Sequence, residues 1–231
     1  LFREKYFQYD IFDRIVDQYI QNHTKITGKK IVSLGSGTGR HEVELSKLGY
    51  EVIGLERNEE SVNIANKYVN KKGANVKIIK CDFLMESEVD AVMELIGEVD
   101  HVVLLFVPIS SNAYNSALKY MAKWIRTGGI FVADNFMYEK DYTYNGINIE
   151  SNVEVAETKD GYAVRLNYYE YKGSLVVWDA IYLYHNDNNE LVMKKDKDIL
   201  EIIPEEVSDR KIHCGGFARI ENRIITECEK Y

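Results

Sequence analysis

Cysteine and long apolar runs are scarce in this chain of 231 residues, which contains three cysteines and two prolines. Cys81, Cys214 and Cys228 are odd in number and far apart in the sequence, so neither a disulfide framework nor a zinc site is expected, and a reducing cytosol is the natural location. No apolar stretch reaches the ~20 residues that span a bilayer, and no signal-peptide pattern opens the chain. We therefore expect a soluble, cytoplasmic protein without a membrane partner.

Basic residues are also in deficit, with 29 Lys and Arg against 37 Asp and Glu and a formal net charge of -8. Extended contact with a nucleic-acid backbone requires clustered Lys and Arg, so a nucleic-acid partner is not expected. The chain also lacks HExxH, paired CxxC, GxSxG and Gly-Lys-Ser/Thr motifs. These absences disfavour a metal site, a covalent serine nucleophile and a nucleoside triphosphate.

A glycine-rich segment, IVSLGSGTGRHEVEL from Ile31 to Leu45, is the most informative feature that is present. A short apolar run followed by closely spaced glycines predicts a strand, a tight turn and a helix whose N-terminal amides point at a ligand. The dinucleotide fingerprint requires a further glycine where this chain has Arg40, and this disfavours a nicotinamide or flavin dinucleotide. Glu56 closes the next apolar run about 20 residues beyond the first glycine, where such folds place an acid for ribose hydroxyls. Adenosine without a pyrophosphate fits this pattern best.

Taken in order from Ile31 to Phe136, these motifs resemble the class I S-adenosylmethionine-dependent methyltransferases. The run VDHVVLLFVPIS resembles the family's fourth strand, whose end flanks the methyl group, and WIRTGGIFVADN resembles its glycine-bearing turn into the fifth strand. The resemblance implies S-adenosyl-L-methionine as cofactor: the glycine turn packs on its methionine part, Glu56 grips the ribose, and Asp82 with Phe83 holds the adenine. The cofactor-binding residues predicted in this way are Gly35, Ser36, Gly37, Thr38, Gly39, Arg40, Glu56, Arg57, Asp82, Phe83 and Phe106.

Three side chains are candidates for a catalytic role, namely Tyr6, His41 and His185. Transfer from a sulfonium requires mainly positioning and exclusion of water, whereas a hydroxyl acceptor also needs a base within hydrogen-bond reach. Each candidate has an equally simple structural role: Tyr6 packing its helix, His41 facing the helix body, and His185 lying in a surface turn. Asp134 and Asn135 end the fifth strand, at the edge where open α/β sheets bind ligands or where turns are capped.

Short β-rich runs alternate with helical stretches from Gly28 to Asn135, which predicts an α/β, Rossmann-like, doubly wound and mostly parallel sheet. Helices are expected over 58–70 and 112–125, and before them an apolar helix that ends ahead of 21–30. Beyond this part we expect a helix over 205–213, a glycine-phenylalanine turn over 214–217 and a strand over 217–228.

The sequence changes character after Asp134, where period-two alternation predicts an inserted antiparallel β-meander. Its expected strands are Ile149–Thr158, Tyr162–Tyr171, Leu175–His185 and Glu190–Leu200. We therefore divide the chain into a methyltransferase core, 1–136 and 201–231, and an insertion, 137–200. Trp178, Tyr182 and Tyr184 are expected on one face of the insertion, to cap the active site, to pair with a second subunit in a homodimer, or simply to pack on the main sheet.

The function expected from the resemblance is methyl transfer to a small-molecule acceptor by in-line displacement, with an amine slightly ahead of a hydroxyl. The amino-sugar and glycine N-methyltransferases are similar in carrying an antiparallel insertion after the fifth strand. Two alternatives remain open at this point. One is a non-catalytic module that binds S-adenosylmethionine, and the other is an aminopropyltransferase on the same scaffold.

Overall fold

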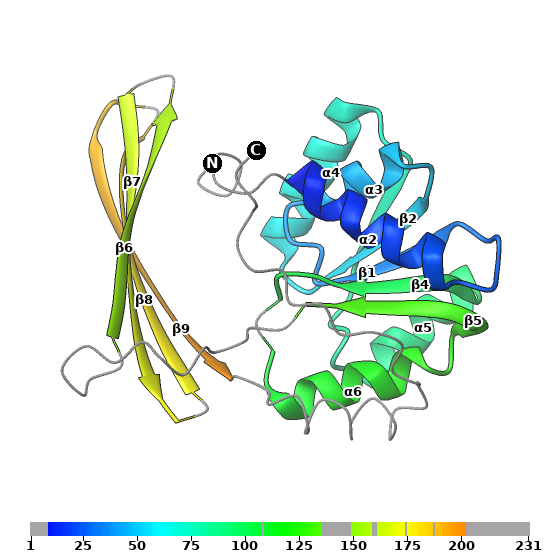
Figure 1. Cartoon of the computed structure of the whole chain (residues 1–231). Coiled ribbons are helices and arrows are strands. Elements are labelled where there is room, and N and C mark those ends of the chain that lie inside the picture. The colour runs from blue at the N-terminus through cyan, green and yellow to red at the C-terminus, as the bar shows by residue number, and fades with distance from the viewer. Residues whose placement is uncertain are drawn as a thin grey trace.

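The first part of the chain forms a parallel sheet covered by helices (Figure 1). The structure is a computed structural model that describes residues 9–107, 109–134, 149–158, 161–173, 175–186 and 188–201. In chain order the elements of the first part are α2 (Tyr9–His23), β1 (Lys30–Leu34), α3 (Arg40–Lys47), β2 (Glu51–Glu56), α4 (Glu59–Lys72), β3 (Val76–Lys80), α5 (Glu86–Ile96), β4 (Val99–Leu104), α6 (Ser111–Met121) and β5 (Ile125–Ala133). The predicted doubly wound α/β architecture is confirmed.

The strand order of this sheet is β3-β2-β1-β4-β5, and every neighbouring pair is parallel. The chain leaves β1 toward β2 and later returns on the other side of β1 as β4, so the order reverses between β1 and β4. Ligands of open α/β sheets bind at such a switch point, outside the carboxyl ends of the strands. The glycine turn after β1 lies at this position.

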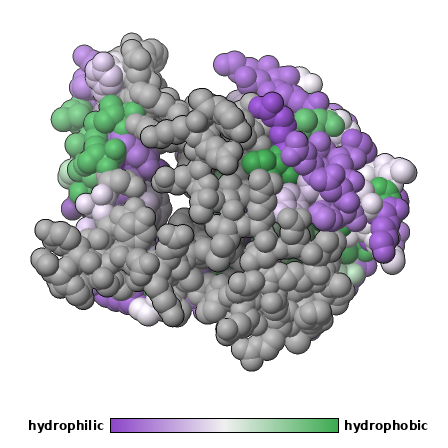
Figure 2. Space-filling model, in the orientation of Figure 1, coloured by the Kyte–Doolittle hydropathy of each residue, from purple (hydrophilic) through white to green (hydrophobic). Residues whose placement is uncertain are grey.

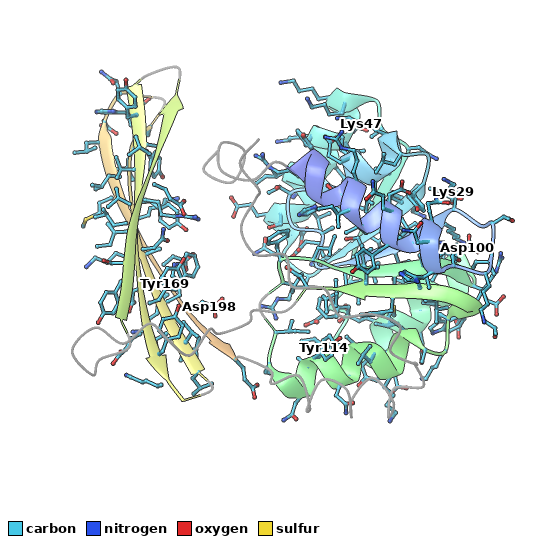
Figure 3. All side chains as sticks on the ribbon, in the orientation of Figure 1. Lys29, Lys47, Asp100, Tyr114, Tyr169 and Asp198 are labelled. Atoms are coloured by element: carbon cyan, nitrogen blue, oxygen red, sulfur yellow. The ribbon has the colours of Figure 1, made fainter. Side chains whose placement is uncertain are left out.

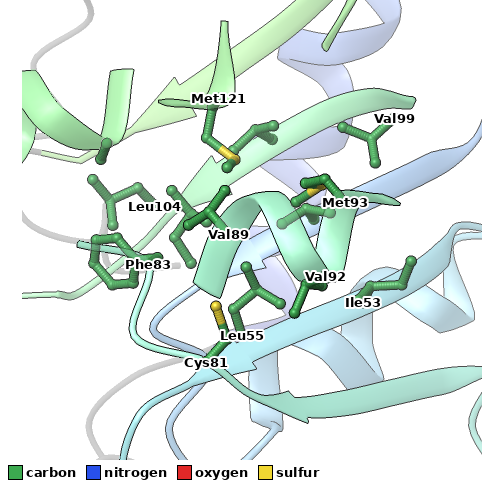
Figure 4. Packing of buried hydrophobic residues seen from close by; sticks show 14 of the residues in the cluster. Ile53, Leu55, Cys81, Phe83, Val89, Val92, Met93, Val99, Leu104 and Met121 are labelled. Atoms are coloured by element: carbon green, nitrogen blue, oxygen red, sulfur yellow. The ribbon is translucent and has the colours of Figure 1, made fainter. Parts of the chain in front are cut away.

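Apolar side chains fill both faces of the parallel sheet. One cluster joins the strands to α5 and α6 and includes Phe83, Val89, Met93, Leu104 and Met121 (Figure 4). A second cluster joins the opposite face to α2 and α3, and a third packs α3 and α4 against β3. Because helices cover both faces, the inner strands are buried along their length, as parallel sheets require.

The predicted helices are present with shifted ends. Val16 and Ile20 are buried in α2, as their spacing predicts, and the helix continues to His23. Asn58 caps α4 by accepting a hydrogen bond from the Ser61 amide, as an N-cap asparagine does. The helix α6 ends at Met121, four residues before the predicted end, because β5 already begins at Ile125.

The predicted glycine turn before the fifth strand is instead part of the strand. The pairing of β5 with β4 shifts between Val99 and His101, opposite Gly128 and Gly129. A Cβ at Gly129 would overlap the Asp100 carbonyl oxygen, and Gly128 has a positive φ of 90°. The two glycines therefore permit a β-bulge with close backbone approach rather than a reversal of the chain.

The second part is the antiparallel meander that the alternation predicts. It comprises β6 (Ile149–Thr158), β7 (Gly161–Lys172), β8 (Leu175–His185) and β9 (Leu191–Glu201) in the order β6-β7-β8-β9. The expected strand bounds differ from these by one residue at most. The predictions for Tyr6 and for 205–228 lie outside the described residues.

The two faces of this antiparallel sheet differ in character. Strand register places Tyr169, Trp178 and Asp198 together on one face, which we call the aromatic face. Figure 3 shows Tyr169 and Asp198 on the side of the sheet toward the α/β part. The opposite face, which includes the row Val153, Leu166 and Ile181, we call the apolar face. Its hydrophobic side chains form the green area on the sheet in Figure 2.

Candidate functional site

The glycine turn between β1 and α3 is held against β2 by its backbone. The amides of Gly35 and Ser36 both donate to the Leu55 carbonyl, at 2.8 and 3.0 Å. Gly35, Gly37 and Gly39 all have positive φ, at 71°, 54° and 80°, which accounts for glycine at each position. A Cβ at Gly35 would lie 2.6 Å from a Val107 methyl, whereas one at Gly37 would meet nothing within 4 Å. The turn is thus tightly packed at its base and open at its tip.

Glu56 ties the end of β2 to this turn. Its carboxylate accepts hydrogen bonds from the Gly37 amide at 2.9 Å and from the Asn58 amide at 2.7 Å, and the residue is only 9% exposed. Each carboxylate oxygen can accept more than one hydrogen bond, so both amide contacts are compatible with a further hydroxyl donor. Glu56 is therefore oriented in advance beside the open tip of the turn.

The residues that are predicted to hold the adenine follow β3 along the same edge. Asp82 is partly exposed, and its carboxylate accepts a hydrogen bond from the Leu84 amide at 3.0 Å. Phe83 is 7% exposed and packs in the core cluster of α5 and α6, so little of its ring reaches the edge. Arg57 is exposed just after β2. The end of β3 thus offers one oriented carboxylate, that of Asp82, while the neighbouring Phe83 is part of the core.

The start of α3 brings Arg40 and His41 to the same edge. The Arg40 guanidinium lies 5.9 Å from the centre of the Tyr68 ring. His41 Nδ1 lies 2.9 Å from Oδ1 of Asp13, a residue of α2 that is completely buried. Since a carboxylate only accepts hydrogen bonds, Nδ1 of His41 carries the proton in this pair. His41 therefore faces α2 through Nδ1 rather than pointing freely outward.

Phe106 follows β4 and faces the same site. Its φ is 55°, the left-handed region that residues other than glycine rarely occupy. Its amide donates to both carboxylate oxygens of Asp134, at 2.9 and 3.0 Å, and its ring stacks on His41 with ring centres 5.2 Å apart. Asp134 thus anchors the backbone that follows β4 and so has a structural role at this edge.

The residues at this edge fit a nucleoside-bearing cofactor such as S-adenosylmethionine. The Ser36 hydroxyl is buried and has no hydrogen-bond partner among the described residues. Its oxygen lies close to Gly54 of β2, where an added Cβ would be 2.8 Å away. A buried hydroxyl without a partner is costly unless a ligand or water satisfies it, so this donor set suits a polar ligand. Thr38 is exposed on the same turn.

The described part of the chain contains neither a reactive thiol nor a candidate metal site. Burial, followed by the charges of Glu88 and Asp82, raises the pKa of the Cys81 thiol to about 11, which keeps it protonated and unreactive at neutral pH. No group of three His, Cys, Asp or Glu side chains within the described ranges could hold a metal ion. Among the helices of these residues none is long and apolar enough to cross a membrane.

His101 and His185 lie apart from the site. His101 is buried in β4, where Nδ1 accepts from the Ile130 amide at 3.2 Å and Nε2 lies 3.3 Å from the Gly28 carbonyl. Its pKa is lowered, mainly by burial, so it is a neutral structural residue, as its position in an apolar strand indicates. His185 is exposed at the end of β8 on the apolar face and is not brought together with His41. Tyr6 lies outside the described residues.

The aromatic face of the antiparallel sheet carries a hydrogen-bonded network. Trp178 Nε1 donates to the Asn167 side-chain oxygen at 3.0 Å, and Asn167 Nδ2 donates to Glu154 at 3.4 Å. Glu154 also pairs with Arg165, whose neighbour across the strands is Tyr182. Asn167 is only 2% exposed, so its amide orients the indole and carboxylate on each side of it. This face therefore presents aromatic rings with fixed polar groups between them.

Asp13 is the residue of this site that sequence reasoning missed. The helical spacing of Val16 and Ile20 marks the buried side of α2, and Asp13 lies one turn before Val16 on that same side. An acid on the apolar side of an amphipathic helix was the available signal. Its partner His41 is 28 residues away, so the sequence alone does not identify the pair.

Comparison with known proteins identifies residues 31–129 as a match to the family described as "Methyltransferase domain". Two curated relatives match over short segments. A 23S rRNA (uracil(747)-C(5))-methyltransferase of Pyrococcus abyssi is 42% identical over 52 residues, 22% of this chain and 13% of that protein. A ubiquinone biosynthesis O-methyltransferase of Nitrosococcus oceani is 30% identical over 59 residues, 26% of this chain and 25% of that protein. The aligned part thus spans a quarter or less of each relative.

Solved structures are similar over most of the chain. The DesVI protein of Streptomyces venezuelae has a TM-score of 0.73 at 14% identity, with 90% of this chain and 83% of that chain covered. CalS10, an amino pentose methyltransferase from Micromonospora echinaspora solved with S-adenosylmethionine bound, has a TM-score of 0.68 at 15% identity, with 90% and 83% covered. At these identities the likeness establishes the shared fold.

Proposed function

We propose that this chain is a class I S-adenosylmethionine-dependent methyltransferase that transfers a methyl group to a small-molecule acceptor, preferably an amine. The observation that carries the proposal is the glycine turn. Its tip at Gly37 is open, and the Gly37 amide donates a hydrogen bond to the buried carboxylate of Glu56. When bound, S-adenosylmethionine supplies a methyl group already activated on a sulfonium. We assign its ribose to Glu56, its adenine to the region of Asp82, and its methionine part to the turn and Phe106.

The chain's own contribution to the reaction is position and exclusion of water. In-line displacement from a sulfonium needs an acceptor held on the far side of the methyl group at close range. The Ser36 hydroxyl and the amides of the turn orient the cofactor, while the ring of Phe106 covers the edge after β4. This arrangement needs no covalent intermediate on the protein.

Two observations support an amine over a hydroxyl compound. A hydroxyl requires a general base, and His185, one of the candidate bases, lies on the opposite face of the sheet from Trp178. The aromatic face, where Trp178 lies across from Tyr169, offers ring faces that suit an amine, which accepts the methyl group in its neutral form. Similar solved structures that are described as a sugar N-methyltransferase and an amino pentose methyltransferase support the same preference.

Calorimetric titration of the purified chain with S-adenosylhomocysteine, with NADH as the contrast, tests the cofactor step. We expect micromolar binding of S-adenosylhomocysteine alone. Binding of NADH instead, or of neither compound, would refute the proposal. Transfer of labelled methyl from S-adenosylmethionine to a panel of amines and hydroxyl compounds then separates an amine N-methyltransferase from an O-methyltransferase. Cofactor binding without any product would indicate a non-catalytic binding module.

We also propose that two copies of the chain associate through the apolar face. Nine of its large side chains are 36–69% exposed in the structure of the whole chain: Val153, Val155, Tyr162, Leu166, Tyr168, Leu175, Leu191, Met193 and Ile199. They come from all four strands of the sheet, and a standard interface takes ~800 Å² from each partner. A patch of this size is rare on a monomer, and the same face on a second copy is apolar and of equal size.

Sedimentation analysis tests this association with a substitution inside the patch. We expect the unchanged chain to sediment as a dimer and Met193→Glu as a monomer, since a buried unpaired charge at an interface is strongly unfavourable. Leu95→Glu is the matched control, because Leu95 is 72% exposed on α5, outside the patch. A monomeric unchanged chain, or a dimer that survives Met193→Glu, would refute this interface.

The cytoplasmic location remains a prediction.

A further inference from the structure

A continuous series of contacts links the N-terminal helix to the backbone after β4. It starts at Asp13 in α2, which is completely buried and paired with His41 Nδ1 at 2.9 Å. The His41 ring then lies nearly parallel to the Phe106 ring, at an interplanar angle of 8° with centres 5.2 Å apart. Three elements, α2, α3 and the end of β4, meet through these side chains.

Phe106 occupies a backbone conformation that its own chemistry disfavours. Residues with a Cβ rarely occupy the left-handed region, and they persist there only where their surroundings hold them. Two contacts supply that constraint: the amide is fixed by the Asp134 carboxylate, and the ring is fixed by His41. Removing either contact leaves the other to hold the strained residue.

The constrained residue is coupled directly to the glycine turn. Val107, the next residue, lies against Gly35 so closely that a Cβ there would be 2.6 Å from a Val107 methyl. A change in the backbone of Phe106 therefore displaces the side chain that supports the base of the turn. Packed side chains that leave no free space transmit such displacements.

We propose that Asp13 and His41 are positioning residues, which hold Phe106 in its left-handed conformation and thereby set the shape of the cofactor site. This inference rests on the proposed function, since it assigns Phe106 to the wall of that site. Asp13 itself contacts no cofactor in this proposal. It acts through His41, whose ring it orients, and His41 acts through the ring of Phe106.

Titration of full-length variants with S-adenosylhomocysteine tests the two steps by loss and rescue. We expect Asp13→Ala and His41→Ala each to weaken binding about tenfold, the equivalent of 1.4 kcal/mol. Asp13→Asn keeps an oxygen that accepts from His41 Nδ1, and His41→Phe keeps a flat ring against Phe106. Both conservative variants are expected to bind within about twofold of the unchanged chain, a factor worth a few tenths of a kcal/mol.

Asp17→Ala is the matched control on the same helix. Asp17 also ties α2 to the rest of the protein, by accepting from the Tyr50 hydroxyl at 2.7 Å. We expect this variant to unfold at a lower temperature, as Asp13→Ala does, while its affinity for S-adenosylhomocysteine stays unchanged. Equal weakening by Asp17→Ala and Asp13→Ala would show a general effect of helix docking and would overturn the proposal.

A double-mutant cycle supplies a readout that is independent of the cofactor. If Asp13 acts through Phe106, Asp13→Ala and Phe106→Ala are non-additive in the free energy of unfolding, whereas Asp17→Ala and Phe106→Ala are additive. Additivity of the first pair would overturn the positioning role. Failure of the unchanged chain to bind S-adenosylhomocysteine would refute the proposed function instead, and the cycle would still decide the link between Asp13 and Phe106.

Discussion

The two sheets of this protein bury their side chains in opposite ways. All six residues of β4 in the parallel sheet are buried, because helices pack on both of its faces. In the antiparallel sheet, most described side chains of β9 are exposed, and Leu191, Met193 and Ile199 are 60–69% exposed. The parallel sheet is therefore complete within one chain, while the apolar face of the antiparallel sheet is suited to contact with another molecule.

The two parts also use polar groups differently. In the parallel part, two buried carboxylates are tied to backbone amides: Glu56 accepts from Gly37 and Asn58, and Asp100 accepts from the Lys30 amide at 2.8 Å. In the antiparallel part, side chains bind one another, as Trp178 does Asn167. Backbone-based sites suit a cofactor common to many enzymes, whereas side-chain networks on a sheet face can be varied to suit a particular acceptor. We infer that acceptor specificity resides on the aromatic face.

Truncation of one isoleucine in each sheet tests the contrast in burial and has the largest expected effect. Ile31→Ala in β1 removes a completely buried side chain and is expected to cost about 2–5 kcal/mol of unfolding free energy. Ile199→Ala in β9 removes a side chain that is 60% exposed, so the cost in the monomer is expected to be within about 0.5 kcal/mol. Urea unfolding of both variants at low protein concentration measures the difference.

Protein concentration provides the control for this pair. If the apolar face is covered in a dimer, the free-energy cost of Ile199→Ala grows as the protein concentration rises. The free-energy cost of Ile31→Ala, measured against the unchanged chain at the same concentration, stays constant. A cost of Ile199→Ala that equals that of Ile31→Ala at every concentration would contradict the comparison, because it would mean that the apolar face is packed within one chain.

Glu56→Ala tests the backbone-based cofactor site and has the next largest expected effect. Loss of charge-assisted hydrogen bonds to the ribose is expected to weaken S-adenosylhomocysteine binding by about 1.5–3 kcal/mol, measured by calorimetry. Glu59→Ala is the control, since Glu59 is an exposed residue nearby that pairs with Lys80. Unchanged affinity in a folded Glu56→Ala variant would refute the ribose assignment.

Local patterns were sufficient to predict most of the fold. Period-two alternation predicted the strands of the meander because successive side chains of a strand point to opposite faces, and the two faces of this sheet differ in character. The glycine spacing from Gly35 to Gly39 and the acid at Glu56 marked the edge of the sheet at which we propose that the cofactor binds, since the glycines serve backbone geometry that few other residues permit. Both kinds of signal are contained within a few consecutive residues.

Features that depend on distant contacts could not be predicted in the same way. The bulge at Gly128 and Gly129 depends on the approach of Asp100 from the neighbouring strand. The strained backbone of Phe106 depends on Asp134, 28 residues later, and its ring contact on His41. No propensity marks a phenylalanine for the left-handed region, because the cost is outweighed only by the folded surroundings.

Glu42 is an exception within the parallel part, because one of its carboxylate oxygens lacks a partner in the described residues. Oε1 accepts from the Ser33 hydroxyl at 2.6 Å, but Oε2 is buried without a hydrogen bond. Burial raises the pKa of Glu42 above its ordinary value of 4.5, and Ser33 and His41 only partly oppose that shift. Between the unfolded and folded pKa values the native chain binds more protons, so Glu42 reduces stability progressively as pH rises through that window.

Glu42→Gln should therefore stabilise the protein at pH 8 and lose this advantage as the pH falls toward the unfolded pKa, where the native glutamic acid is already protonated. At pH 8 we expect an increase in Tm of about 2–4 °C, the shift that ~1 kcal/mol produces in a chain of this size. Thermal unfolding between pH 4.5 and 8 measures the trend, with Glu51→Gln as an exposed control that is expected to show no stabilisation. A stabilisation that is equal at every pH would show that packing, rather than the buried charge, limits stability at Glu42.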